Sequence, residues 1–450
     1  APALVEMSSP PLAAIVMAAG LGTRMRSAVP KHLHTLLGRR LVDWVVEAAR
    51  PLLPQPLVVV ASPQTKAALA DTDGLVVAVQ ERPLGTGDAA RAAQPALSDF
   101  PGDILVLPGD TPLLTPELLD GLLSEHRRAG ADVTVLSFQP EDPGAYGRIV
   151  RDEDGSLAAI VEAADASPGE LALREVNSSI YVFSAPSLWP ALKRLEAKNA
   201  QGELYLTDAV GHILAAGGRT AVYASPDPVQ PLGVNTRVEL AAAAAVLRRR
   251  LNEAHMVAGV GIVDPETTWI DADVELAPDA IVHPFTVIRG KARIGPGAEI
   301  GPHAVVVDAE VGPGAVVGPF CYLRPGTVLS TGAKAGAFVE VKNSRIGDRA
   351  KVPHLSYIGD ADIGEDTNIG AGAITANLPH ERGRGKQRTR IGRNVRTGVD
   401  NSFIAPVTIG DNAWVAAGSV ITDDVPPGAL AIARARQVNK EGYVGGQRGD

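Results

Sequence analysis

Three absences set the first limits on this chain. It has a single cysteine, Cys321, so no disulfide can form within it. No apolar run reaches the roughly 18 residues that a membrane-spanning helix needs. The first twelve residues lack the basic-then-apolar layout of a secretory leader. We therefore expect a soluble, cytoplasmic protein with no membrane partner.

An excess of positive charge is also missing. Lys and Arg number 42 against 51 Asp and Glu, which gives a formal net charge of −9. A chain with this balance has no overall basic field to attract nucleic acid, so we expect no nucleic-acid partner. What the chain does have is length, because 450 residues with 45% hydrophobic content are enough for two or three domains with real cores.

The last third of the chain repeats an aliphatic residue followed by glycine. A six-residue period with one inward aliphatic side chain is typical of a parallel β-helix, whose stacked coils bury the core between them. A glycine-rich β-sandwich would alternate polar and apolar residues without this phase. The ten pairs begin at Ile294, Ile300, Val311, Val317, Ile346, Ile358, Ile363, Ile369, Ile391 and Ile409.

The first half of the chain has a different pattern. Short apolar runs bounded by turn residues alternate with helical segments, which predicts a mostly parallel sheet covered on both faces. The apolar runs cover 13–17, 57–60, 104–107 and 133–136, and the clearest helical patterns cover 41–49 and 116–126.

A long helix, which Thr236 can cap, separates the two patterns. We expect an α/β domain over 1–235, a linker helix over 236–258 and a β-helix over 259–450, with regular hexads beginning near Ile281. Pro426-Pro427-Gly428 is expected to interrupt the coils and leave a loosely held tail.

A glycine-rich loop follows the first apolar run. Gly20 and Gly22 let the backbone approach an anion, Arg24 adds a forked donor and Lys31 adds a point charge. The loop lacks the third glycine of the dinucleotide fingerprint and the Gly-Lys-Ser/Thr of a P-loop. A lone Gly-x-Gly is more often a simple turn, but its place after the first strand, followed by these cations, favours phosphate binding.

The loop and the hexads together resemble a known family from about Ala14 to Arg434. This is the family of bacterial bifunctional N-acetylglucosamine-1-phosphate uridyltransferases and glucosamine-1-phosphate acetyltransferases. The resemblance implies a Rossmann-like α/β nucleotidyltransferase domain, a linker helix and a left-handed parallel β-helix of hexapeptide repeats. It also implies a homotrimer, because family β-helices pack side by side.

Two reactions follow from this resemblance. The C-terminal domain would transfer the acetyl group of acetyl-CoA to glucosamine-1-phosphate. The N-terminal domain would then transfer uridylyl from UTP to N-acetylglucosamine-1-phosphate and release pyrophosphate, without a covalent enzyme intermediate. Mg²⁺ and positioning would supply the catalysis of the second step.

The resemblance assigns residues to the nucleotide site. Asp110 and Asn235 match the two Mg²⁺ ligands, Gln80 matches the uracil pocket, and Glu162 and Asn177 match the sugar pocket. A glutamine amide offers both a donor and an acceptor to uracil. The full set of matched positions is Met17, Ala18, Ala19, Gly20, Arg24, Lys31, Gln80, Gly85, Thr86, Pro108, Gly109, Asp110, Gly147, Glu162, Asn177 and Asn235.

The acetyltransferase residues are assigned in the same way. A lone histidine is more often structural, but His354 matches the general base that would take a proton from the attacking amine. Arg324, Lys342, Tyr357 and Asn368 match the glucosamine-1-phosphate site. Backbone amides near Ala371 and Gly372 are candidates to stabilise the thioester oxygen. The matched acetyl-CoA positions are Ala371, Asn377, Leu378, Lys386, Val399, Ala417 and Arg434, and the basic loop 380–390, with Arg382, Arg384, Arg388 and Arg390, could hold the phosphates of the cofactor.

Four residues depart from the family pattern. Ser179 stands where glycine is usual and Asp88 where histidine is usual. On the cofactor side, Leu378 replaces a tyrosine and Val399 replaces a serine. None of these changes removes a matched Mg²⁺ ligand or His354.

Three alternatives compete with this interpretation. The chain could be a uridyltransferase on a purely structural β-helix, or a non-enzymatic assembly or regulatory subunit. Retention of the matched residues in both halves argues against each. A zinc β-helix enzyme of the carbonic anhydrase kind would need a histidine triad, and no repeat spacing that forms one relates His283, His303, His354 and His380.

Overall fold

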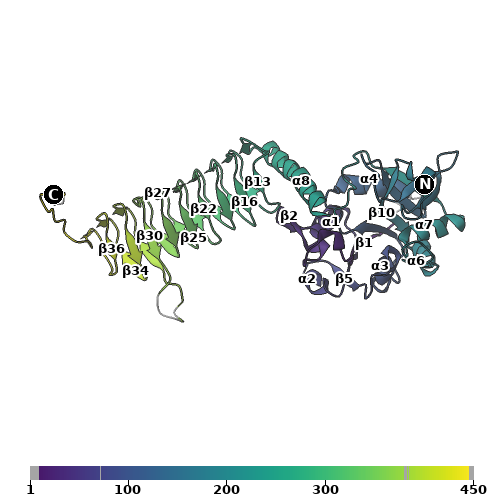
Figure 1. Cartoon of the computed structure of the whole chain (residues 1–450), viewed down its shortest axis with the longest axis horizontal. Helices are drawn as coiled ribbons and strands as arrows, with labels where there is room; N and C mark the ends of the chain where they lie inside the picture. Colours follow the sequence, from purple (N-terminus) through teal and green to yellow (C-terminus); the bar gives the residue numbers. More distant parts are fainter. Residues whose placement is uncertain (1–9, 71, 380–382, 384, 445–450) are drawn as a thin grey trace, which may run out of the picture. The chain divides into compact units, whose positions relative to one another are not determined.

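The computed structural model describes residues 10–70, 72–379, 383 and 385–444 (Figure 1). The chain divides into two compact units, Ala1–Leu247 and Arg248–Asp450. Within the described ranges, no helix combines the length and apolarity needed to cross a membrane.

A nine-stranded sheet forms the centre of the first unit, with the order β11-β7-β10-β6-β1-β4-β5 and with β8 pairing to β10 and β9. Strand β1 pairs in parallel with β4 and β6, whereas β10 runs antiparallel to β6 and β7. The predicted α/β architecture is confirmed. The strands are β1 (Leu12–Ala18), β4 (Leu57–Ala61), β5 (Val76–Val79), β6 (Asp103–Pro108), β7 (Val133–Phe138), β8 (Arg148–Arg151), β9 (Leu157–Val161), β10 (Val176–Ser184) and β11 (Thr220–Ala224), with β2 (Thr35–Leu36) and β3 (Arg39–Arg40) as a separate pair.

Helices cover both faces of this sheet, because its central strands are apolar on both sides. In β1, Ile15 and Met17 belong to one buried cluster, and Val16 and Ala18 belong to the other. The first cluster includes residues of α3 (Thr86–Ala92), α6 (Ala185–Lys193) and α7 (Leu206–Ala215), and the second includes residues of α1 (Leu41–Ala49) and α4 (Pro116–Ala129). Two shorter helices are α2 (Lys66–Ala70) and α5 (Pro168–Leu171).

Helix α8 (Arg237–Val257) begins at a capping box. The Thr236 hydroxyl accepts a hydrogen bond from the Glu239 amide at 3.2 Å. In return, the Glu239 carboxylate accepts from the Thr236 amide at 2.8 Å. This reciprocal pair satisfies amides that a helix start leaves open, so the structure shows Thr236 in its expected capping role.

The second unit is a parallel β-helix, whose strands stack into ladders along the chain (Figure 1). Ile281 pairs with Glu299, eighteen residues on, and Glu299 pairs with Val316, seventeen residues on. The buried interior combines large aliphatic side chains such as Ile300 with alanines such as Ala298, two positions earlier. The hexad pattern therefore predicted this core correctly.

In the described part of the β-helix, the strands form three long ladders and one short ladder. The first contains β12 (Gly261–Ile262), β15 (Ile281–Val282), β18 (Glu299–Ile300), β21 (Val316–Val317), β24 (Lys334–Ala337) and β27 (Lys351–His354). The second contains β13 (Trp269–Ile270), β16 (Val287–Arg289), β19 (Val305–Val307), β22 (Tyr322–Leu323), β25 (Glu340–Lys342), β28 (Tyr357–Gly359), β30 (Ile374–Ala376), β33 (Ser402–Ile404) and β36 (Val420–Ile421). The third contains β14 (Glu275–Leu276), β17 (Arg293–Ile294), β20 (Glu310–Val311), β23 (Val328–Leu329), β26 (Arg345–Ile346), β29 (Ala361–Ile363), β31 (Thr389–Ile391) and β34 (Val407–Ile409), and the short ladder contains β32 (Arg396–Thr397), β35 (Trp414–Val415) and β37 (Leu430–Ala431).

The coils begin earlier than the regular hexads. Strand β12 already pairs with β15, about twenty residues before the expected start at Ile281. The inward residues Ile262 and Ile270 are buried, but Val263 and Asp271 follow them instead of glycine. These first coils therefore share the core of the later ones without the aliphatic–glycine signature.

The expectation that Pro426-Pro427-Gly428 interrupts the coils was wrong. Val425 still bridges to Ile409, and β37 pairs with β35 beyond the prolines. Gly428 has φ 68°, close to the 65° of Gly297 in the Pro296-Gly297 turn. Pro427-Gly428 thus makes the same kind of coil turn as earlier Pro-Gly pairs, because proline favours the first turn position and glycine accepts the positive φ.

Candidate active sites

A cavity of about 490 Å³ lies at the carboxyl ends of β1 and β6. Strands β4 and β6 pair with opposite edges of β1, so the strand order reverses at β1. In open α/β folds, ligands bind beyond the carboxyl ends of the strands at such a point. The matched residues that line the cavity are Met17, Ala19, Gly20, Lys31, Gln80, Gly85, Thr86, Pro108, Asp110 and Asn235.

The other matched positions lie beside or behind this cavity. Ala18 is fully buried in the sheet, and the Gly109 amide donates to the Met17 carbonyl at 2.8 Å. A Cβ at Gly109 would come within 2.9 Å of that carbonyl, so only glycine fits there without a shift. Arg24 reaches the site through Asn235, as described next.

Four charged and polar side chains converge at the mouth of the cavity. The Lys31 ammonium is ion-paired with Asp110 and also donates to Asn235 Oδ1 at 3.0 Å. Arg24 Nη2 donates to the same Asn235 oxygen at 2.9 Å. Burial would raise the pKa of Asp110, but the charge and hydrogen bond of Lys31 outweigh it and hold that pKa below its usual value. The carboxylate is therefore ionised at neutral pH.

Asn235 is held by the start of helix α8. Its amide donates to the Glu239 carboxylate at 2.7 Å, which ties the residue to the capping box. Two sets of hydrogen bonds therefore orient Asn235. Glu239 binds its backbone N–H, and Arg24 and Lys31 bind its side-chain oxygen.

His32 lines the same cavity and was missed by the sequence analysis. Its side chain is 4% exposed, and within the described part of the chain its Nδ1 has no hydrogen-bond partner. Burial is the main reason that the pKa of His32 falls to about 4, against the opposing pull of Asp110. The imidazole is neutral at pH 7, next to the Asp110–Lys31 pair.

Gln80 is oriented by one of the residues that depart from the family pattern. Its amide nitrogen donates to the Gly85 carbonyl at 3.1 Å and to the Asp88 carboxylate at 3.0 Å. A carboxylate can only accept, so Asp88 fixes which end of the amide faces it. Both N–H groups of Gln80 are then used within the protein, and its carbonyl oxygen is the group left to meet a ligand.

The matched sugar-pocket residues form a connected cluster. The Asn177 amide donates to the Gly147 carbonyl at 2.8 Å, and a Cβ at Gly147 would lie 3.4 Å from the Glu162 carboxylate. Glu162 accepts from the Thr207 hydroxyl at 2.9 Å, and burial raises its pKa. The structure therefore brings Gly147, Glu162 and Asn177 together, although none of them lines the 490 Å³ cavity itself.

Ser179 joins this cluster to the cavity. It lines the cavity and its amide donates to Asn177 Oδ1 at 3.1 Å. Its φ is 62°, in the left-handed region that glycine adopts at little cost. The serine that replaces the usual glycine therefore keeps the glycine conformation and adds a hydroxymethyl group at the cavity wall.

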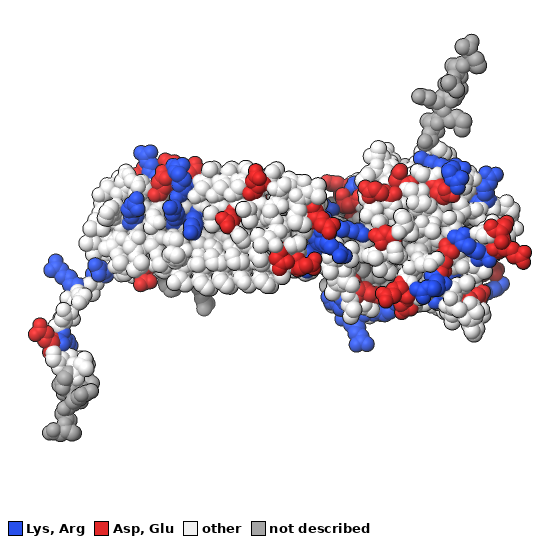
Figure 2. Space-filling view, turned by 90° about the horizontal axis from the view of Figure 1, so that it is seen from above, with Lys and Arg blue, Asp and Glu red and all other residues white. Residues whose placement is uncertain are grey.

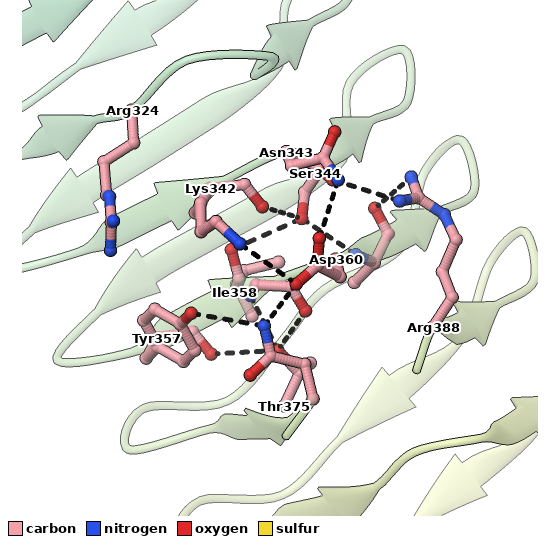
Figure 3. Close-up of polar contacts among 12 residues, drawn as sticks. Arg324, Lys342, Asn343, Ser344, Tyr357, Ile358, Asp360, Thr375 and Arg388 are labelled. Atoms are coloured by element: carbon pink, nitrogen blue, oxygen red, sulfur yellow. Dashed lines mark hydrogen bonds and ion pairs between the residues drawn. The ribbon is translucent and has the colours of Figure 1, made fainter. Parts of the chain in front are cut away.

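A polar network lies where three strands of the second ladder, β25, β28 and β30, end (Figure 3). At its centre the Asp360 carboxylate receives hydrogen bonds from Lys342 at 3.3 Å, from Asn343 at 2.6 Å and from Asn377. Asn377 also donates to the Tyr357 hydroxyl at 3.4 Å. Three matched residues, Lys342, Tyr357 and Asn377, are thus brought into one cluster.

Arg324 lies beside this network and is ion-paired with Glu340 at 2.9 Å. Its amide donates to the Val341 carbonyl, which puts it one coil before Lys342. Asn368 lies on a different ladder, where it bridges Lys351 and Arg396. Among the described contacts, Asn368 has no side-chain bond to the Asp360 network.

His354 is the first residue of a column of positions that lie above one another in successive coils and are linked by backbone hydrogen bonds. Its carbonyl accepts from the Gly372 amide at 3.4 Å, and the Ala371 carbonyl accepts from the Asp400 amide at 2.8 Å. In the following coil, the Val399 carbonyl accepts a hydrogen bond from the Gly418 amide at 2.8 Å. The matched positions that follow one another along this column are His354, Ala371, Val399 and Ala417.

The remaining matched positions are exposed, as is Val399 in the column. Leu378 is 68% exposed and Val399 is 49% exposed. The side chain of Arg434 lies beside Gly418, because a Cβ added to that glycine would be 3.9 Å from Arg434 Cδ. In the basic loop, Arg388 forms a two-bond ion pair with Asp362 and donates to the Asn343 carbonyl at 3.1 Å. His380, Arg382 and Arg384 lie outside the described residues.

Sequence reasoning missed the centre of the Asp360 network. The five-residue step between Ile358 and Ile363 does not single the site out, because the same step separates the inward residues Val341 and Ile346 one coil earlier. The step after Ile358 accommodates Asp360, whose φ of 50° turns the chain between β28 and β29. A Cβ at Gly359 would overlap the Tyr357 hydroxyl, so this glycine serves the site and not only the coil turn.

Known families match parts of the chain. Residues 14–212 match the MobA-like NTP transferase domain, and residues 388–423 match the hexapeptide repeat of succinyl-transferase. These two regions lie in the α/β unit and in the β-helix respectively.

Curated relatives are similar over nearly the whole sequence. "Bifunctional protein GlmU" of Mycobacterium tuberculosis (strain ATCC 25177 / H37Ra) is 48% identical over 459 residues, which covers 96% of this chain and 92% of the relative. The protein of the same name from Streptomyces avermitilis is 48% identical over 460 residues, with 97% and 95% covered. That of Caldanaerobacter subterraneus subsp. tengcongensis is 45% identical over 451 residues, with 96% and 97% covered.

Proposed function

The chain belongs to the family of the bifunctional protein GlmU, and from this membership we propose how its residues carry out two successive reactions. It is a bifunctional enzyme of UDP-N-acetylglucosamine synthesis, with a nucleotidyltransferase half and a hexapeptide-repeat acetyltransferase half. Functionally we divide it into a uridyltransferase domain (1–235), a linker helix (236–258) and an acetyltransferase domain (259–450), and we expect it in the cytoplasm.

UTP occupies the 490 Å³ cavity in this proposal. The backbone of the Gly20–Gly22 loop faces the phosphates, Arg24 and Lys31 neutralise their charge, and the Gln80 carbonyl oxygen accepts from the uracil ring N–H. The sugar phosphate, held by the Glu162–Asn177 cluster, attacks the α-phosphorus directly. It is already an anion, so no side chain has to remove a proton.

Asp110 and Asn235 suit a divalent cation. Both present an oxygen to the same Lys31 ammonium, so the two oxygens face one small region at the cavity mouth. Mg²⁺ is usually held by few protein oxygens together with phosphate oxygens and water. When bound, Mg²⁺ would neutralise charge on the phosphates, and Lys31 would move from Asp110 to a phosphate.

The acetyl step takes place along the β-helix. Lys342 and Arg324 bind the phosphate of glucosamine-1-phosphate, with Tyr357 and Asn368 as further contacts. The His354 imidazole takes the proton that the amine loses when it attacks the thioester. Acetyl-CoA lies along the column of Ala371, Val399 and Ala417, with Asn377, Leu378, Lys386 and Arg434 beside it.

We also expect a homotrimer. Phe285, His303, Phe320 and Phe338 stack in successive coils with ring centroids 4.9, 4.8 and 5.1 Å apart, and the three phenylalanines are 49–59% exposed. The face of the β-helix drawn in Figure 2 also carries few charges over much of its length. An exposed apolar column of this kind favours contact with another chain.

Light scattering tests the assembly. Phe320→Glu combined with Phe338→Glu should convert the trimer into smaller species, whereas Trp414→Glu, an aromatic of similar exposure in the short ladder, should leave it intact. A monomeric unmutated chain would contradict the trimer.

The first test of function is thiol release from acetyl-CoA, with and without glucosamine-1-phosphate. Sugar-dependent release supports acetyl transfer and shows that Leu378 and Val399 are tolerated. If thiol is not released but pyrophosphate is still formed from UTP and N-acetylglucosamine-1-phosphate, the chain is a uridyltransferase on a structural β-helix. Absence of both activities would favour an assembly or regulatory subunit.

A further inference from the structure

We infer that Asp360 is a positioning residue of the acetyltransferase, which holds Lys342 and Asn377 in the arrangement that the two substrates require. This inference rests on the proposed acetyl transfer, and it assigns a role to a residue outside the matched positions.

Asp360 is a buried carboxylate in a fixed backbone position. It is 6% exposed, its amide donates to the Lys342 carbonyl at 2.9 Å, and its carbonyl accepts from the Thr389 amide at 3.1 Å. Its φ of 50° is unfavourable for most side chains but tolerated by aspartate. A buried carboxylate is costly unless it is paired and hydrogen-bonded, so its partners show what it is there to hold.

The partners of Asp360 come from the two coils on either side of its own. Oδ1 accepts from Asn343, and Oδ2 accepts from both Lys342 and Asn377 (Figure 3). A single oxygen therefore joins the residue assigned to the sugar phosphate with a residue assigned to acetyl-CoA. The two substrates must meet between these groups, so an atom that fixes both sets their separation.

Charge gives a second reason for this role. Burial would raise the pKa of Asp360, but hydrogen bonds from Asn343, Asn377 and Lys342 outweigh it and hold the pKa below its usual value. Lys386 lies close enough to Lys342 to have its own pKa lowered by it. The ionised Asp360 offsets the repulsion between the two ammonium groups and keeps Lys342 beside the network.

Asp360→Asn tests the inference, because it keeps the shape and removes the charge. We expect the KM for glucosamine-1-phosphate and for acetyl-CoA to rise roughly 10- to 100-fold each, as for loss of hydrogen bonds to a charged group. Pyrophosphate formation from UTP should be unchanged, which shows that the α/β unit is intact and that the effect is confined to the other unit.

Asp366→Asn is the matched control. Asp366 also has a left-handed φ, of 56°, and an ion pair, with Arg349 at 2.7 Å, but it is exposed and outside the network. It should leave both KM values as they are. If Asp360→Asn fails to fold, Asp360→Glu keeps the charge and displaces it by one methylene, and should still raise both KM values.

A double-mutant cycle separates positioning from mere stabilisation. In a Lys342→Met background, Asp360→Asn should add nothing to the KM for glucosamine-1-phosphate but should still raise the KM for acetyl-CoA. Full additivity on the sugar, or unchanged KM values in folded Asp360→Asn or Asp360→Glu, would overturn the inference. Absence of sugar-dependent thiol release from the unmutated chain would overturn the proposed acetyl transfer and this inference with it.

Discussion

Lys31 and Asp110 form an ion pair although 79 residues separate them in sequence. Asp110 follows the end of β6, and Lys31 follows the glycine-rich loop after β1, so the parallel pairing of these strands brings them together. The pair places a cation for phosphate and an anion for a metal ion at the same edge of the sheet. Binding of Mg²⁺ to Asp110 and of phosphate to Lys31 would break this ion pair. Each residue then has its own ligand, so each can be tested by its own substitution.

Asp110→Asn should reduce uridylyl transfer by roughly 10²–10³-fold, because a neutral amide binds Mg²⁺ poorly and no longer pairs with Lys31. Thiol release from acetyl-CoA should be unaffected, since His354 lies in the other unit. Pyrophosphate release at several Mg²⁺ concentrations measures the effect, and partial rescue at high Mg²⁺ is expected. Unchanged uridylyl transfer would remove Asp110 from the site.

His354→Gln should reduce acetyl transfer by about 10²–10⁴-fold, because glutamine cannot take up the proton of the attacking amine. Uridylyl transfer should continue at the original rate. His283→Gln is the control, since His283 is another β-helix histidine, bonded to Glu299 at 2.7 Å. Equal loss of both activities in the His354 variant would contradict two separate sites.

The features that sequence predicted best are those with a regular period. The aliphatic–glycine pairs from Ile294 onward identified the β-helix, and the apolar runs identified the central strands of the sheet. The first coils escaped because Ile262 and Ile270 are followed by residues other than glycine. Pro427-Gly428 was misread because proline and glycine mark a turn, and sequence alone does not say whether the chain resumes its path afterwards.

The site residues divide in the same way. The sequence offered candidates that carry a motif, such as Lys31 and Asp110, whereas it gave no sign of residues defined by their neighbours. Nothing local in the sequence says that Asp88 turns the Gln80 amide, because that bond needs the loop and helix α3 in place. Asp360 likewise acquires its role only when three coils stack and bring Lys342 and Asn377 to one carboxylate.

Ser179→Gly should stabilise the α/β unit by about 1 kcal/mol, because glycine adopts the φ of 62° without the cost that serine bears. It also removes a side chain from the cavity wall, so the KM for N-acetylglucosamine-1-phosphate should change while acetyl transfer stays constant. Thermal unfolding and pyrophosphate release measure the two effects. Ser178→Gly, which loses the bond from its buried hydroxyl to the Leu136 carbonyl, should instead destabilise the unit.

His32 should make the α/β unit sensitive to mild acid. Burial lowers its pKa from 6.5 to about 4 in the folded chain, whereas Asp110 pulls it upward and Lys31 pushes it further down. Between these two values the unfolded chain binds a proton that the folded chain does not. Stability should therefore be complete above about pH 6.5 and decline toward pH 4, by up to about 1.4 kcal/mol per pH unit.

His32→Gln removes the titrating group and should flatten the decline in the unfolding transition of this unit, followed by calorimetry of the full chain from pH 7 to pH 4. His34→Gln is the matched control two residues away. His34 is also buried, but it has a partner for Nε2 in the Val29 carbonyl at 3.2 Å and does not line the cavity. Burial and the charge of Arg237 lower the pKa of His34 as well, but its hydrogen bond to Val29 opposes this, so the His34 variant should remove less of the slope. An unchanged slope in His32→Gln would mean that the imidazole is already protonated in the folded chain, stabilised by Asp110 against its burial.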